Sequence, residues 1–337
     1  DREAFVLQME QAAQDKKNHA HWEKVAPSNL PRAFEQLPAG GLAARTRALL
    51  KIEDGCNNFC TYCIIPYARG RVRSMPLEAA VEETKKLARE GYREIVVNGI
   101  EISSWGWEWK NGSRLSALLL AICQAAPEVR IRLGSLEPRT IDEDFCKTLS
   151  VCKNLCPQFH LSLQSGSDTV LKRMNRKYDT ARYLESVRLL HRYFPGCAIT
   201  TDLIVGFPGE TEEDFQATLD LIQRVKYMQL FTFIYSKRTG TIAAKLPDPA
   251  THAEKAARMD RLLKLQDSIA FPMIAAMAGQ TVKVLVEAAG RTPGTLNGRL
   301  DNNLVVEFPA EESLIGQYAN VRLTGSRAAL LVGELAE

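Results

Sequence analysis

Short apolar runs alternate with longer amphipathic segments from about residue 47 to residue 235. Apolar, β-branched runs bounded by turn residues predict strands, and an apolar residue at every third or fourth position predicts helices. The six predicted strands are RALLKIE, REIVVNG, VRIRLGSL, QFHLSLQS, CAITTDLIVGF and QLFTFIY. Strands that alternate with helices form parallel sheets. Since a closed TIM barrel needs eight such units, the pattern predicts an α/β fold with a partial (β/α)6 TIM-like barrel over residues 46–275.

Helices are predicted between these strands. They cover residues 76–90, 114–126, 141–154 and 210–225, and a long helical stretch covers residues 167–177 and 180–194. Pro76 suits the first turn of the first helix, and Gly91 suits its C-terminal cap. Thr211 and Asp214 have the spacing of a capping box at the start of the helix over 210–225.

The pattern changes after residue 279. Short alternating strands with turn residues between them predict a small antiparallel β-barrel of about five strands, similar to an OB-type module, over residues 276–337. A helix over residues 247–271 is predicted to connect the two domains. Residues 1–45 are rich in Pro, Gly and Ala and are interpreted as a linker. Because OB-type modules commonly hold oligonucleotides, the small domain is a candidate RNA-binding unit.

Composition narrows the class of protein. The chain has 337 residues and a formal net charge of +3, so it is no polycation, although local basic clusters can still contact phosphates. Eight cysteines are too few for a disulfide scaffold at this length, which favours a reducing cytosol and a cytoplasmic protein. No apolar run reaches transmembrane length, and residues 1–25 lack a secretory apolar core, so no membrane association is expected.

Three cysteines follow the first predicted strand, namely Cys56, Cys60 and Cys63, with the spacing C-x3-C-x2-C. Thiolates bind zinc or iron–sulfur clusters, and both kinds of site usually have four protein ligands. A cluster held by only three thiolates keeps one iron free to bind a substrate. The alternatives are three structural thiols, or a zinc ion with His160 or Cys197 as a distant fourth ligand. Ligands bind at the carboxyl ends of parallel strands, and the cysteines lie at that end.

Further polar and glycine positions are candidates for binding a cofactor. These positions are Gly99, Glu101, Ser162, Gln164, Arg176, Asp202 and Gly206. Glycine allows a ligand to approach the backbone, a carboxylate such as Glu101 can pair with an ammonium group, and Arg176 can hold a carboxylate. Strand-to-loop turns, capping and hydrogen bonds within the core are the structural alternatives for these residues.

The remaining cysteines are interpreted as structural thiols. Cys146, Cys152 and Cys156 resemble a second ligand group, but one helix over residues 141–154 places Cys146 and Cys152 on different faces. Cys123 and Cys197 lie in apolar contexts, which favours core thiols.

Several blocks of the chain resemble a known enzyme family. CNNFCTYC resembles the cysteine motif of radical S-adenosylmethionine (SAM) enzymes. IIPYARGRVRS, HLSLQSGS, MNRKY, DLIVGFPGET and YSKRTGT resemble blocks of the methylthiotransferase branch, and the last part of the chain is similar to its TRAM domain, an RNA-binding module. Within the branch, the chain is most similar to the enzymes that act on N6-threonylcarbamoyladenosine in tRNA. Sister groups act on isopentenyladenosine in tRNA or on an aspartate of a ribosomal protein.

The resemblance implies that Cys56, Cys60 and Cys63 bind a [4Fe–4S] cluster whose free iron chelates SAM. Reductive cleavage of SAM would give a 5′-deoxyadenosyl radical, which would abstract hydrogen from C2 of the adenine at tRNA position 37 before a methylthio group is inserted. The implied partners are tRNA and an electron donor such as flavodoxin or ferredoxin. A non-catalytic RNA-binding protein with a structural zinc is the alternative of a different class.

One departure from the family concerns its N-terminal domain, in which three more cysteines hold a second [4Fe–4S] cluster involved in sulfur transfer. This chain has no cysteine before Cys56 and begins with Asp1. Residues 1–45 are therefore expected to be a remnant of a truncated domain. Radical generation is then the activity that the residues support, rather than the complete methylthiolation.

Overall fold

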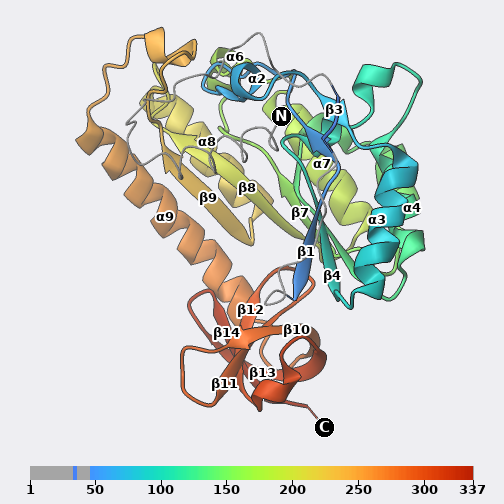
Figure 1. Cartoon of the computed structure of the whole chain (residues 1–337). Helices are drawn as coiled ribbons and strands as arrows, with labels where there is room; N and C mark the ends of the chain where they lie inside the picture. Colours follow the sequence, from blue (N-terminus) through green and yellow to red (C-terminus); the bar gives the residue numbers. More distant parts are fainter. Residues whose placement is uncertain (1–32, 36–45, 337) are drawn as a thin grey trace, which may run out of the picture.

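The computed structural model describes residues 33–35 and 46–336, and the interpretation of residues 1–45 falls almost entirely outside this part of the chain. Parallel strands in sequence order form two adjoining sheets, β1-β4-β5 and β6-β7-β8-β9. The strands are β1 (Arg47–Lys51), β4 (Glu94–Asn98), β5 (Arg130–Leu133), β6 (Ser135–Leu136), β7 (Gln158–Leu161), β8 (Ala198–Val205) and β9 (Gln229–Ile234). Since β5 and β6 are separated only by Gly134, they follow one strand direction. The predicted partial (β/α)6 barrel is therefore confirmed (Figure 1).

Helices flank the outer face of these sheets (Figure 1). They are α3 (Leu77–Arg89), α4 (Leu115–Ala125), α5 (Glu143–Leu149), α6 (Asp168–Arg173), α7 (Thr180–Tyr193) and α8 (Glu212–Val225). Strand residues of one parity, such as Leu50, Ile95 and Phe159, are buried in the resulting core. Residues of the other parity face the barrel interior, where Glu94 and Arg132 form an ion pair.

Three details of the helices differ from the prediction. The long stretch over 167–177 and 180–194 is two separate helices, because Asn175 adopts a left-handed conformation (φ 59°) and Asp179 starts a new helix by accepting from the Arg182 amide. The helix predicted over 141–154 ends at Leu149. Pro76 is the N-cap of α3 rather than a first-turn residue. The capping box of Thr211 and Asp214 is confirmed.

A long helix, α9 (His252–Ala275), leads to a small closed barrel. The strands of this barrel are β10 (Thr281–Ala289), β11 (Thr295–Arg299), β12 (Val305–Pro309), β13 (Tyr318–Arg327) and β14 (Leu330–Leu335). The predicted small antiparallel β-barrel is confirmed, and one of its neighbouring strand pairs, β12 with β14, is parallel. A ring with an odd number of strands cannot alternate direction throughout, so one neighbouring pair must be parallel.

Polar contacts attach the small barrel to the end of the sheet opposite the cysteines (Figure 1). Arg132 donates to the carbonyl oxygens of Asp301 (2.7 Å) and Leu300 (3.1 Å), and the Tyr318 hydroxyl donates to the carbonyl of Arg93 (2.8 Å). Arg132 also pairs with the buried carboxylate of Glu94. The connection between the domains is thus built from buried charge and backbone carbonyls.

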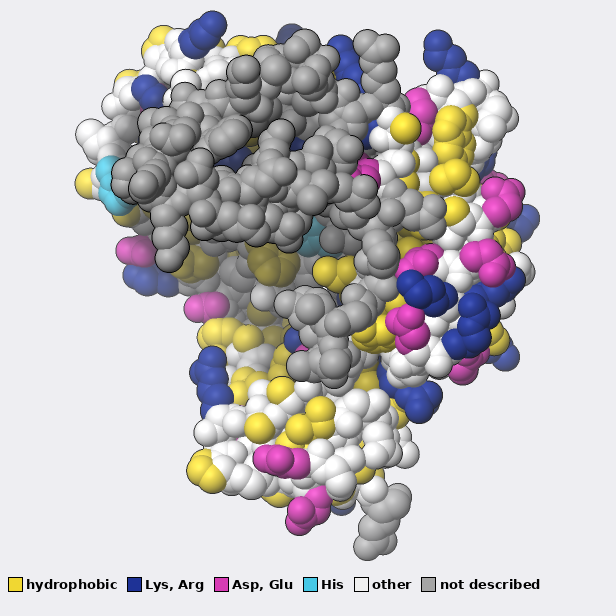
Figure 2. Space-filling view, in the orientation of Figure 1, with side chains coloured by type: hydrophobic (Ala, Val, Ile, Leu, Met, Phe, Trp, Pro, Cys, Tyr) yellow, Lys and Arg dark blue, Asp and Glu magenta, His cyan; other side chains and the backbone are white. Residues whose placement is uncertain are grey.

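The outer face of α3 is a solvated, mixed-charge surface. Lys85 pairs with Glu82, and Lys86 pairs with Glu83, so acidic and basic side chains interleave there (Figure 2). No helix within residues 33–35 and 46–336 is long and apolar enough to cross a membrane.

Candidate cluster and cofactor site

The three cysteines lie on a loop whose ends are clamped together. The loop leaves through β2 (Glu53–Asp54) and returns through β3 (Arg73–Ser74), and these short strands pair antiparallel. The amide of Cys56 donates to the carbonyl of Gly70 (3.1 Å). Gly55 has a φ of +85°, and a Cβ there would lie 2.1 Å from the carbonyl oxygen of Arg71. The closure of the loop therefore requires glycine at this position.

The segment after α6 holds the other side of the loop. Asn175 donates from Nδ2 to the carbonyl of Phe59 (2.9 Å), and the amide of Thr61 donates to the carbonyl of Met174 (3.0 Å). Arg71 lies over the ring of Phe59 at 4.4 Å from its centroid. These contacts fix the loop between elements that are distant in sequence.

The thiols are close enough to influence each other and are partly shielded from water. Cys56 is buried, and burial, together with the nearby thiols, raises its pKa to about 12. Burial also raises the pKa of Cys63, while the charges of Arg238 and Arg176 act in the opposite direction. A bound metal would have to displace these protons, since thiolates rather than thiols are metal ligands.

Arg176 brings a positive charge to Cys60. Its Nη1 lies 3.2 Å from the Sγ of Cys60, and its Nε donates to the hydroxyl of Tyr178 (2.9 Å). Its Nη2 is buried and has no hydrogen-bond partner among the described residues. A buried guanidinium with an unused donor fits an anionic group bound beside Cys60.

Glu101 and Gly99 lie beside the loop after β4. The side chain of Glu101 accepts from Asn58 (3.4 Å) and from the amide of Ser103 (3.3 Å). Burial raises the pKa of Glu101 to about 7, although the charge of Arg176 opposes the shift. A Cβ at Gly99 would lie 2.9 Å from the carboxylate of Glu53, so glycine is explained there by packing as well as by ligand access.

Ser162 and Gln164 follow directly after β7, and Asp202 lies on the inner face of β8. Ser162 shares a hydrogen bond with Ser135 (2.8 Å), and Asp202 contacts Nε2 of His160 (3.2 Å). Gln164 is buried and adopts a positive φ of 74°, and its backbone N–H donates to the carbonyl of Asp202. Asp202 and His160 thus belong to the inner face of the sheet, whereas the backbone of Gln164 bridges to Leu203, whose side chain lies in the hydrophobic core.

Gly206 has a different environment. Its φ is +71°, and a Cβ there would lie 2.4 Å from Cγ of Lys255. The aliphatic part of a side chain from α9 therefore fills the space beside Gly206. Its predicted role in binding a cofactor stays a prediction, as do the cofactor roles of the other six positions.

Sequence reasoning did not single out Glu53. Its side chain is fully buried, its Oε2 accepts from the amide of Glu101 (2.7 Å), and its Oε1 has no partner among the described residues. The available signal was the charged pair in KIEDG at the end of an apolar strand. Glu53 thus connects the loop of the cysteines to the loop that carries Glu101.

The donor set fits an iron–sulfur cluster better than a single zinc ion. A structural zinc site requires four ligands that converge on one tetrahedral centre. His160 contacts Asp202 and Thr200, and Cys197 contacts His191, so neither completes a zinc site. In a cubane each thiolate binds a different iron, and the loop offers three thiols and a neighbouring cation.

Comparison with known families decides between these interpretations. The model of the radical SAM superfamily matches residues 50–222. The chain belongs to the radical SAM superfamily. The prediction from the sequence is thereby confirmed, and so, at the level of the superfamily, are its cofactors, a [4Fe–4S] cluster and SAM. The model of the TRAM domain matches residues 275–336, which include the small barrel.

Curated relatives of this radical SAM chain carry the name tRNA-2-methylthio-N(6)-dimethylallyladenosine synthase. The protein of this name from Thermoanaerobacter sp. (strain X514) is 43% identical over 305 residues, which are 90% of this chain and 64% of the relative. The one from Moorella thermoacetica is 42% identical over 296 residues, or 88% of this chain and 67% of the relative. The chain thus spans about two thirds of the length of these relatives.

A solved structure supports the fold alone. The radical SAM methyltransferase TsrM from Kitasatospora setae, in complex with tryptophan and a SAM analogue, has a TM-score of 0.50 at 18% identity. The match covers 59% of this chain and 38% of that protein. It agrees with the partial barrel described above.

Proposed function

We propose that this chain is the SAM-cleaving and RNA-binding part of a tRNA methylthiotransferase that modifies C2 of the adenine at position 37. The observation that carries the proposal is the junction of two units in one chain. The loop of Cys56, Cys60 and Cys63, with Arg176 beside Cys60, lies at one end of the partial barrel, and a TRAM domain is docked at the other end. A radical SAM barrel supplies the chemistry, and a TRAM barrel supplies the affinity for RNA.

The relatives' names favour an adenine that carries a dimethylallyl group on N6, the second of the tRNA substrates predicted from the sequence. The first prediction, N6-threonylcarbamoyladenosine, has no support from these names. An aspartate of a ribosomal protein is the third substrate predicted from the sequence, and the relatives' names give it no support either.

Each part of the site has a chemical task in this proposal. Cys56, Cys60 and Cys63 hold the cluster, which when bound supplies one electron for reductive cleavage of SAM to a 5′-deoxyadenosyl radical. Glu101 pairs with the amino group of SAM, and Arg176 neutralises negative charge beside Cys60. Ser162 and Asp202 offer polar contacts to the cofactor, and Gln164 offers another directly after β7. A small reductase such as flavodoxin or ferredoxin is the expected electron donor.

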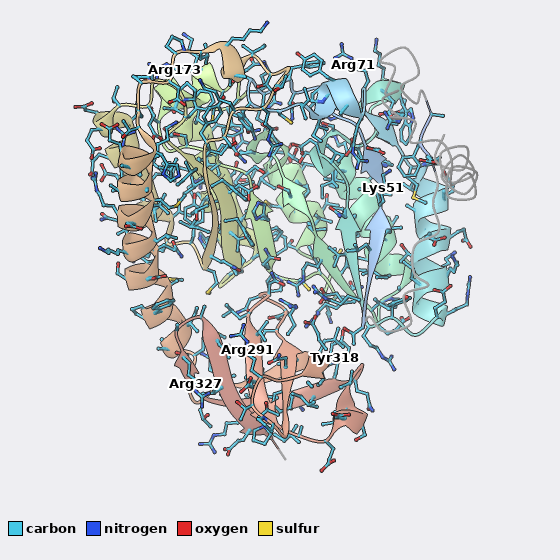
Figure 3. All side chains as sticks on the ribbon, turned by 60° about the vertical axis from the view of Figure 1, so that its left-hand side comes forward. Lys51, Arg71, Arg173, Arg291, Tyr318 and Arg327 are labelled. Atoms are coloured by element: carbon cyan, nitrogen blue, oxygen red, sulfur yellow. The ribbon has the colours of Figure 1, made fainter. Side chains whose placement is uncertain are left out.

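The two ends of the molecule are far apart, and both carry cations (Figure 3). Arg71 and Arg173 stand at the end with the cysteine loop, while Arg291 and Arg327 stand on the small barrel (Figure 3). The helix α9, which leads from the main barrel to the small one, has 24 residues and is about 36 Å long at the helical rise of about 1.5 Å per residue. An anticodon arm that contacts both ends must therefore lie along the side of the barrel.

The test is anaerobic reconstitution with iron and sulfide, followed by measurement of 5′-deoxyadenosine with SAM and a reductant. We expect a cluster absorbance band and SAM cleavage that increases when tRNA with dimethylallyladenosine at position 37 is added. One equivalent of zinc with no cluster band would instead support the non-catalytic RNA-binding protein. An increase with the ribosomal protein, and none with tRNA, would replace the RNA substrate by a protein substrate.

A further inference from the structure

Two phenylalanine side chains of β9 remain half exposed although they belong to the main sheet. The exposed fractions are 40% for Phe231 and 54% for Phe233. Phe231 pairs in register with Asp202, so the two side chains lie on the same face of the sheet. Leu230, of opposite parity, packs against the hydrophobic core instead. Phe231 and Phe233 therefore face the interior of the partial barrel.

The inner face around this aromatic pair is both apolar and polar. The ring of His160 lies 5.5 Å from that of Phe231, and His160 also contacts Asp202 (3.2 Å). On the opposite edge strand, β1, Leu49 is 50% exposed, whereas its neighbours Ala48 and Leu50 are buried. Large apolar side chains that remain exposed beside a few polar groups mark a binding site for a ligand of the same mixed character.

We propose that Phe231 and Phe233 bind the adenine that is modified together with an apolar substituent on its N6. This inference rests on the proposed function. Proteins recognise unpaired RNA bases by stacking them on aromatic side chains, and a half-exposed ring on an edge strand offers such a surface. Contact with an apolar substituent would remove the remaining exposed area of the rings from water.

The same surface disfavours a substituent that ends in a carboxylate. A threonylcarbamoyl group would bring its negative charge against two aromatic rings and towards the carboxylate of Asp202, which already pairs with His160. Removing a charge from water without giving it a new partner is costly. The surface would therefore favour the dimethylallyl substituent partly because it disfavours the charged threonylcarbamoyl one. The aromatic pair would then be the element that distinguishes the two tRNA substrates.

The experiment measures binding of anticodon stem–loop oligonucleotides to the reconstituted chain by fluorescence anisotropy. Three oligonucleotides carry adenosine, dimethylallyladenosine or threonylcarbamoyladenosine at position 37. The variants are Phe231→Ala, Phe233→Ala and the double substitution, with Leu263→Ala as the matched control because Leu263 is an exposed apolar residue of α9 (42%). Thermal unfolding midpoints check that all the variants are folded.

We expect the unsubstituted chain to bind the dimethylallyl oligonucleotide most tightly. The double variant should lose about tenfold in affinity for it, the size of one lost base stack, and only about twofold for the unmodified oligonucleotide. Leu263→Ala should change neither value.

Two different failures can be told apart. If no oligonucleotide binds and tRNA leaves SAM cleavage unchanged, the proposed function itself is wrong. If tRNA stimulates cleavage but the double variant keeps the full preference, only the role of the aromatic pair is overturned. Tighter binding of the threonylcarbamoyl oligonucleotide to the unsubstituted chain would also overturn the inference and leave the proposed RNA substrate intact.

Discussion

The guanidinium of Arg176 lies 3.2 Å from the Sγ of Cys60, although 116 residues separate them in the chain. The residue comes from the turn after α6, which also holds the loop through Asn175. Its second terminal nitrogen is buried and unpartnered among the described residues. The geometry gives the cysteine loop a fixed positive charge, which stabilises thiolate ligands and an anionic cluster.

Replacing Arg176 by Met should therefore weaken the cluster. Hydrogen bonds that involve a charged group contribute about 1.5–3 kcal/mol, so we expect lower iron content after reconstitution and SAM cleavage slowed about tenfold or more. Arg176→Lys should recover part of the loss, because lysine keeps the positive charge but lacks the planar set of N–H donors of a guanidinium. Arg188→Met on the exposed side of α7 is the control. Equal iron content and an unchanged reduction potential in Arg176→Met would contradict this role.

The backbone at Gly55 gives a second prediction. Gly55 and Gly91 both have positive φ, but a Cβ at Gly55 would strike the carbonyl of Arg71, whereas a Cβ at Gly91 would meet no atom within 4 Å. Gly91→Ala should carry only the cost of a left-handed alanine, about 1 kcal/mol. Gly55→Ala should in addition open the loop and prevent cluster loading. The iron content and the unfolding free energy of both variants test this prediction. Equal iron content in Gly55→Ala and Gly91→Ala would mean that the cysteine loop tolerates a Cβ at position 55.

Arg132 and Glu94 should control how firmly the TRAM domain is docked. Burial alone would raise the pKa of Glu94, but the hydrogen bonds and charges of Arg132 and Arg130 outweigh it and lower the pKa. Breaking a buried ion pair on one side typically costs about 3–5 kcal/mol, so Arg132→Met should strongly destabilise the junction. We expect separate unfolding transitions for the two domains and faster proteolysis between them. The exposed pair Lys85–Glu82 offers a control, and Lys85→Met should leave a single transition unchanged.

The sequence was sufficient for those parts of the fold that have a local signal. Apolar runs located all six strands of the partial barrel because the core side of each strand is buried by helices. The break between α6 and α7 was missed because no Gly or Pro marks it, although the caps Ser167 and Asp179 are visible in the sequence. The parallel pairing of β12 with β14 has no local signal, because the pattern of apolar residues along a strand does not indicate which strand it pairs with.

The residues of the site likewise fall into those with a local sequence signal and those without one. The spacing of Cys56, Cys60 and Cys63 is a local pattern that indicates a metal site, and the resemblance of its motif to radical SAM enzymes is what predicted a cluster. The contact of Arg176 with Cys60 and the burial of Glu53 depend on how distant loops meet, and no periodicity encodes that. The exposure of Phe231 and Phe233 was likewise invisible, because a strand that is half buried and one that faces a binding site show the same alternation.

Exposed arginines of the TRAM domain should contribute to RNA affinity. Arg322 and Arg327 are exposed on β13, and Figure 3 shows Arg327 on the small barrel. If each contacts one phosphate, the double substitution by Gln should weaken tRNA binding and reduce the slope of log K against log salt by roughly 1.5–2. SAM cleavage without RNA should not change. Lys85→Gln on α3 is the control, and an unchanged salt slope in the double variant would place the RNA on another surface.

The buried carboxyl of Glu53 should make stability depend on pH. Burial raises its pKa from 4.5 to about 8, and the charges of Glu101 and Asp54 act in the same direction. Between pH 5 and pH 8 the folded chain therefore holds a proton that the unfolded chain has released, so the free energy of unfolding falls as the pH rises. Glu101, with its pKa raised to about 7, adds to the same slope.

Glu53→Gln should flatten the dependence of the unfolding free energy on pH without abolishing it, as measured by urea unfolding at pH 5, 6.5 and 8. Glu82→Gln is the control, because the pKa of Glu82 is lowered and its titration lies below this window. Parallel slopes for Glu53→Gln and the unsubstituted chain would show that Glu53 is ionised in the folded state.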